Sequence, residues 1–134
     1  MRRLSVVLLV LAIAVAGVAA GCGGSDEAEE EPTTPAEAVT EIDEIKTMLQ
    51  NSVHQVRSGD PAEAEATVGD AYLEHFEHVE GPLDKVDHEL NETLEDSIRE
   101  ELRDKIKAKA SAAEIAALKR EIDANLDKAE AALR

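Results

Sequence analysis

Residues 71–80 read Ala-Tyr-Leu-Glu-His-Phe-Glu-His-Val-Glu and bring phenol, imidazole and carboxylate side chains together within ten residues. They include the only Tyr and the only Phe of the chain, and two of its four His residues. Imidazole and carboxylate groups bind Zn, Cu and Fe ions, and helical bundles build metal sites from inward-facing Glu and His. The candidate metal ligands are therefore the acidic and imidazole side chains of this stretch, namely Glu74, His75, Glu77, His78 and Glu80.

Packing alone is the alternative interpretation of the same stretch. On a helix that turns 100° per residue, one broad face carries Val68, Tyr72, His75, Phe76 and Val79. In this interpretation His75 is a core histidine that bonds to a neighbouring Glu, while His78 lies at the solvent-exposed edge. A buried imidazole or phenol needs such a partner, because an unsatisfied polar group costs about 1–3 kcal/mol. The residues alone leave both interpretations open.

Elsewhere the sequence offers little that could catalyse a reaction. The single cysteine, Cys22, belongs to an N-terminal signal. None of the serines in the rest of the chain stands in the glycine-framed turn that exposes a nucleophile. The seven glycines lie mostly near the N-terminus and form no phosphate-binding loop. We therefore expect a protein that is not an enzyme, with an iron or copper ion as the one cofactor that its residue types favour.

The first 21 residues have the features of an export signal. Arg2 and Arg3 precede an apolar run over residues 4–20, which ends in small residues at Ala19-Ala20-Gly21-Cys22. This ending resembles the lipobox of bacterial lipoproteins, in which the Cys becomes the lipidated first residue, although Ala19 stands where Leu is usual. The alternatives are an ordinary secretory signal and a retained membrane anchor, for which the run is short. We expect Cys22 to be lipidated and the protein to be extracytoplasmic, anchored to the bacterial cell membrane.

The charge balance narrows the range of partners. After cleavage the chain would keep 12 of its 14 basic residues against 30 acidic ones. So acidic a chain is not expected to bind nucleic acid, which requires a basic surface, or to cling to an anionic membrane. Residues 22–34 combine the lipidated Cys with Gly, Ser, Asp, Glu and Pro and predict a flexible acidic tether.

Helix signals organise the remainder of the chain into four predicted helices, over residues 35–57, 61–80, 88–108 and 112–133. Capping boxes begin the first and last of them at Thr34-Pro35-Ala36-Glu37 and Ser111-Ala112-Ala113-Glu114. No segment alternates with period two, so no sheet is expected. Short connections between amphipathic helices favour an all-α fold, an up-down-up-down four-helix bundle over residues 35–134.

Capping residues and helix breakers predict where the first helix ends, where the second helix begins and ends, and where the third helix begins. Asp60 and Asp87 are the predicted caps of the second and third helices, and Gly59 is the predicted stop of the first. Gly81-Pro82 is predicted to end the second helix near residue 80. Apolar residues of the third helix recur strictly every fourth position, so its two ends should contact different neighbours or cross them at a steeper angle.

The central stretch also resembles a known family. Residues 71–83, together with Asp87-His88-Glu89-Leu90 and Leu94-Glu95, are similar to the extracytoplasmic helical region that precedes the membrane domain of bacterial high-affinity iron permeases. Residues that match the family pattern are Tyr72, Phe76, Glu77 and Glu80, whereas His75 and His78 are additional. The permeases' Arg-Glu-x-x-Glu motif is missing, because Arg99-Glu100 is followed by Glu101-Leu102-Arg103.

The resemblance implies a detached extracytoplasmic domain that receives or hands over iron, or that docks on an iron permease. The alternative function is a non-catalytic interaction module of the cell envelope without a metal role. Leu73 lies outside the main apolar face of its predicted helix and could belong to a docking surface for such a partner.

Overall fold

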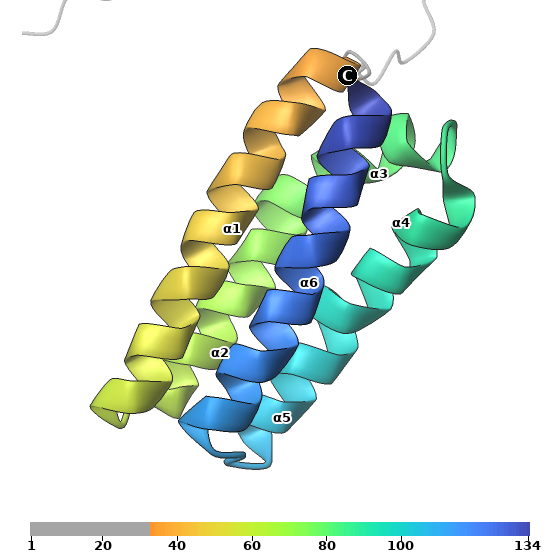
Figure 1. Cartoon of the computed structure of the whole chain (residues 1–134). Coiled ribbons are helices and arrows are strands. Elements are labelled where there is room, and N and C mark those ends of the chain that lie inside the picture. Colours follow the sequence, from red (N-terminus) through yellow and green to blue (C-terminus); the bar gives the residue numbers. More distant parts are fainter. Residues whose placement is uncertain (1–32) are drawn as a thin grey trace, which may run out of the picture. The chain divides into compact units, whose positions relative to one another are not determined.

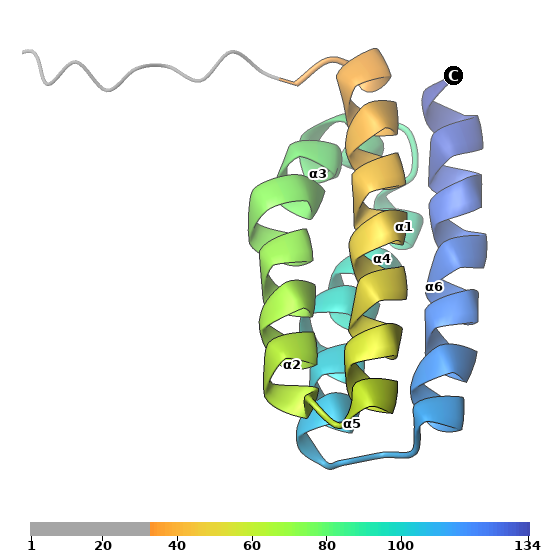
Figure 2. The same cartoon turned by 90° about the vertical axis from the view of Figure 1, so that its left-hand side faces the viewer.

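The computed structural model describes residues 33–134. The predicted signal peptide and Cys22 lie outside the described residues, as does the predicted tether up to residue 32. Within residues 33–134 the chain is all-helical and contains no β-strand, as predicted. The helical elements form rods that lie side by side (Figures 1 and 2).

The first and last rods are continuous helices, α1 (Pro35–Ser58) and α6 (Ala112–Leu133). The second rod joins α2 (Pro61–Asp70), the π-helix η1 (Ala71–Phe76) and α3 (Glu77–Asp84). The third joins α4 (His88–Glu95), the π-helix η2 (Asp96–Leu102) and α5 (Arg103–Lys107). The α3–α4 turn lies at the same end as the start of α1, and the α5–α6 turn lies at the opposite end (Figure 1).

Local capping chemistry begins and ends these rods as the sequence predicts. Reciprocal capping boxes are formed by Thr34 with Glu37 and by Ser111 with Glu114. The Asp60 side chain accepts a hydrogen bond from the Glu63 amide, and Asp87 likewise caps α4 through the Leu90 amide. Gly59 ends α1 at φ 87°, a left-handed conformation that glycine adopts without a Cβ penalty.

The prediction that Gly81-Pro82 ends the second helix was wrong, because α3 continues to Asp84. A proline inside a helix removes one backbone hydrogen bond and crowds the preceding turn. Here Pro82 and Leu83 are both buried, so apolar burial offsets the lost bond. Gly81 is exposed, and a Cβ placed there would meet no atom within 4 Å.

The two π-helical segments were not predicted, and the third rod shows what such a segment does. Leu94, Ile98, Leu102 and Ile106 recur every fourth residue, yet each is at most 1% exposed. In a pure α-helix such a row drifts around the axis, but the wider π turn of η2 counteracts the drift. Both ends of this rod pack on the second rod, α4 on α3 and α5 on α2, and α4 also contacts α6, so the two ends do not face different rods as the drift predicted.

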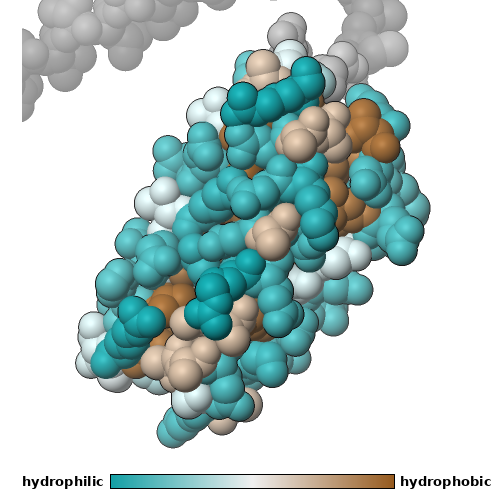
Figure 3. All heavy atoms as spheres, in the orientation of Figure 1, coloured by the Kyte–Doolittle hydropathy of each residue, from teal (hydrophilic) through white to brown (hydrophobic). Residues whose placement is uncertain are grey.

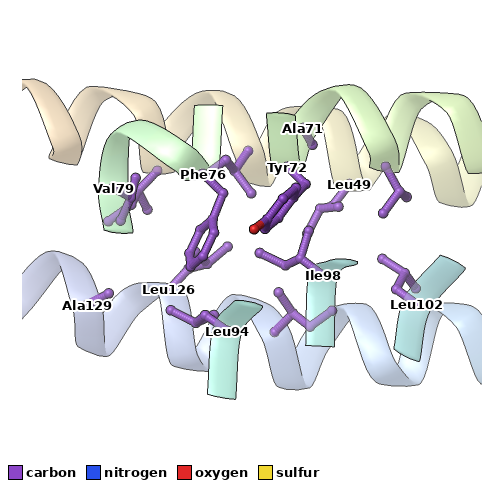
Figure 4. Close-up of a cluster of buried hydrophobic side chains, with 14 of the residues drawn as sticks. Leu49, Ala71, Tyr72, Phe76, Val79, Leu94, Ile98, Leu102, Leu126 and Ala129 are labelled. Carbon is purple, nitrogen blue, oxygen red and sulfur yellow. The ribbon is translucent and has the colours of Figure 1, made fainter. Parts of the chain in front are cut away.

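The core between the rods is aliphatic apart from one aromatic pair. Tyr72 and Phe76 lie with ring centroids 5.9 Å apart, among side chains that include Leu49, Leu94 and Leu126 (Figure 4). Hydrophilic side chains cover most of the outer face seen in Figure 3. Within residues 33–134, no helix has the length and apolar character that crossing a bilayer requires.

Candidate functional site

His75 is held by a carboxylate from a different rod. Its Nδ1 lies 2.7 Å from Oε2 of Glu41 on α1, and both side chains are about a quarter exposed. The contact joins η1 to α1 at the edge of the core. This is the arrangement that the packing interpretation predicts for His75, with Glu41 as the neighbouring acid.

Tyr72 is the centre of a second polar group, which faces the third rod rather than α1. Its hydroxyl donates to Oε1 of Glu80 at 2.9 Å and lies 3.4 Å from Oε1 of Glu95. Arg99 bonds to the same Glu95 oxygen at 2.5 Å, and its guanidinium carbon lies 5.8 Å from the centre of the Tyr72 ring. The group therefore links η1 and α3 to the end of α4 and to η2.

The electrostatics of this group oppose the charged form of Glu80. Burial raises the pKa of the Glu80 carboxyl, and the negative charges of Glu95 and Glu77 raise it further, against the hydrogen bond from Tyr72 and the charge of Arg99. Burial also raises the pKa of the Tyr72 phenol, and both neighbouring carboxylates act in the same direction. Tyr72 consequently serves as a neutral hydrogen-bond donor between two acidic side chains.

The other predicted ligands point away from these contacts. Glu74, Glu77 and His78 are all exposed. Among the described residues, none of these three side chains has a hydrogen-bond or ion-pair partner. The structure therefore separates the five predicted ligands. His75 pairs with Glu41 and Glu80 pairs with Tyr72, whereas the other three are exposed.

No three His, Cys, Asp or Glu side chains within residues 33–134 are arranged to hold a metal ion. The exposed set nevertheless shares one face of the rod, since Glu77 and His78 follow Glu74 by three and four residues, about one helical turn. Exposed side chains of this kind can change rotamer at low cost. A site here would have to be assembled by the ion from Glu74, Glu77 and His78.

Three partners in these contacts were missed in the sequence, namely Glu41, Glu95 and Arg99. Glu41 lies next to the apolar stripe of α1, but its pairing with His75 depends on the register between two rods. The Glu95–Arg99 pair has a sequence signal, because opposite charges four residues apart attract on a helix. Their contact with Tyr72 again depends on how the second and third rods pack.

The remaining histidines lie apart from both contacts. His54 is exposed on α1. His88 begins α4, and its hydrogen bond with Asp84 at 2.5 Å raises the pKa of the imidazole, as does the nearby charge of Glu92. This His therefore ties together the two ends of the α3–α4 turn.

Comparisons of the chain with protein-family models, with curated proteins and with solved structures give no match.

Proposed function

We propose that this protein is a lipoprotein tethered outside the cytoplasm by Cys22, an up-down-up-down helical bundle that serves as a non-enzymatic accessory to iron or copper uptake. In this proposal it binds metal on its surface and hands it to, or docks on, an iron permease or another envelope protein. The export signal, the acidic composition and the resemblance of residues 71–95 to iron permeases support this function.

The observation that carries the proposal is the exposed set Glu74, Glu77 and His78. Tyr72 and Phe76 are buried, while His75 and Glu80 have partners inside the fold. The bundle therefore does not need the three exposed side chains for its packing, and they remain free for a ligand. Carboxylate and imidazole together suit iron and copper ions, which a surface site can exchange with a partner.

Calorimetric titration of the mature chain with Fe(II), Fe(III), Cu(II) and Zn(II) tests the proposal. Binding should also raise the melting temperature, because a ligand at 100 times its Kd stabilises the native state by about 2.7 kcal/mol. The variant with Glu74→Gln, Glu77→Gln and His78→Asn should lose this binding. A matched control removes the same groups from exposed positions elsewhere, through Glu44→Gln, Glu63→Gln and His54→Asn.

Metal binding that survives in the site variant, or that falls equally in the control, would contradict the assignment. The absence of both heat and a melting shift at millimolar metal would count against any metal role.

A docking module without metal is the second candidate, and the exposure of Leu73 favours it. This side chain is 58% exposed although it lies between the buried Tyr72 and Phe76. A photo-crosslinking amino acid at position 73 should then capture a neighbouring envelope protein in cells, whereas one at position 109 should not. Loss of the specific adduct in a Glu77→Gln variant would show that the acidic neighbours also contribute to docking.

A further inference from the structure

Charge is distributed unequally along the bundle axis. We divide each rod at its midpoint and define the tether half as residues 33–46, 73–97 and 123–134, which surround the point where the chain joins the bundle. This half contains 16 acidic and 4 basic residues. The far half, residues 47–72 and 98–122, contains 9 acidic and 8 basic residues. Nearly all of the net negative charge of the described residues therefore lies at one end.

The fold creates this separation, because each half draws on all four rods. The start of α1, the α3–α4 turn and the end of α6 meet at the tether end, as Figure 1 shows. At the far end, Arg103 and Lys107 on α5 form ion pairs with Glu65 on α2. The far end is thus internally neutralised. In the tether half Glu44, Glu74, Glu77 and Glu89 are exposed.

We infer that this charge separation is a stand-off device, which holds the tether half of the bundle away from an anionic lipid surface. The inference rests on the proposed anchoring through Cys22. Anionic lipids repel the tether half within a Debye length, about 8 Å at physiological salt. Residues 23–34 carry five further acidic residues and no basic one. Fully extended, these residues span at most about 40 Å, well beyond the range of the repulsion.

The consequence concerns which partner the domain can reach. A domain that lay on the bilayer would hide its tether half against lipid. A domain that is held off keeps Glu74, Glu77 and His78, which lie in the tether half, accessible. A partner would therefore meet the domain above the lipid headgroups.

The single cysteine makes a direct test possible. The mature chain is coupled through Cys22 to maleimide lipid in vesicles, with a fluorescent amino acid in place of Val86, which is 56% exposed at the tether end. Energy transfer to acceptor-labelled lipid is compared between phosphatidylcholine vesicles and vesicles of equal parts phosphatidylcholine and phosphatidylglycerol. Transfer should be lower on the anionic vesicles at 0.01 M salt. The two should converge at 1 M, where the Debye length is only about 3 Å.

Two matched variants test whether the position of the acidic residues matters or only their total number. Asp43→Asn, Glu44→Gln and Glu89→Gln remove three exposed charges from the tether half, and Glu63→Gln, Glu101→Gln and Glu121→Gln remove three from the far half. The first variant should reduce the difference between the two kinds of vesicle more than the second. Far-ultraviolet circular dichroism checks that both variants stay folded.

Equal transfer on both kinds of vesicle at low salt would overturn the inference, and so would higher transfer on the anionic ones. Equal effects of the two variants would overturn the role of charge placement. Because chemical coupling replaces lipidation, these outcomes are independent of whether cells lipidate Cys22, which mass spectrometry of the mature protein tests separately.

Discussion

The exposure pattern of η1 predicts a large difference between two substitutions three residues apart. Phe76 is fully buried and stacks on Tyr72, whereas Leu73 is 58% exposed. Replacing a buried Phe by Ala typically costs about 3–5 kcal/mol, because the side chain loses its burial and leaves a cavity. We expect Phe76→Ala to fall in that range. Leu73→Ala should change the free energy of unfolding by less than about 0.5 kcal/mol.

The cost of Phe76→Ala would be a large fraction of the total stability. A domain of this size is stable by roughly 5–15 kcal/mol. With a urea m-value of about 2 kcal/mol/M, the unfolding midpoint should fall by about 1.5–2.5 M. The measurement is urea unfolding followed by circular dichroism and by Tyr72 fluorescence, which reports on this layer alone because the chain has one Tyr and no Trp.

A midpoint shift below about 0.5 M for Phe76→Ala would refute the placement of Phe76 in the core. An equal or larger shift for Leu73→Ala would refute the orientation of η1, because a shift of that segment by one residue would move Leu73 into the buried place of Tyr72 and Phe76 into the half-buried place of His75.

Three further predictions follow from individual contacts. Because burial raises the pKa of Glu80 in the folded state, its contribution to stability is complete below its unfolded pKa of about 4.3 and is lost as pH rises through the folded pKa. Glu80→Gln should therefore raise the melting temperature at pH 7 and leave it unchanged at pH 3; a lower melting temperature at pH 7 would contradict the sign. Thr34→Ala and Ser111→Ala should each cost about 0.5–2 kcal/mol in urea unfolding, and the two costs should add because the caps belong to different helices. A double-mutant cycle with Glu41→Gln and His75→Asn should show a coupling energy of about 0.5–3 kcal/mol, and independent effects would refute their contact.

Local sequence signals were sufficient for the helices themselves. Thr34 and Ser111 cap their own helices, and Gly59 stops α1, through hydrogen bonds that span only three to five residues. The periodic apolar stripes likewise depend on neighbours within the same helix. Such contacts are encoded wherever the right residue types recur at the right spacing, so the rod boundaries could be predicted closely.

Tertiary packing decided the features that local signals either missed or opposed. Gly81-Pro82 is a strong helix breaker, yet α3 continues through it because Pro82 and Leu83 are buried. The π turn of η2 brings the four-residue repeat of its rod onto a single buried face, a demand set by the neighbouring rods.

The candidate site could be predicted from the sequence only in part, and tertiary packing decided the rest. The sequence by itself identified the stretch 71–80, its apolar face and the outward position of Leu73. Only the packing of α1 and the third rod against it assigned Glu41 to His75, and Glu95 and Arg99 to Tyr72. Those partners are 23–34 residues away in the chain. Their pairing follows from the register of whole rods, which is fixed by the summed burial of many side chains rather than by any local motif.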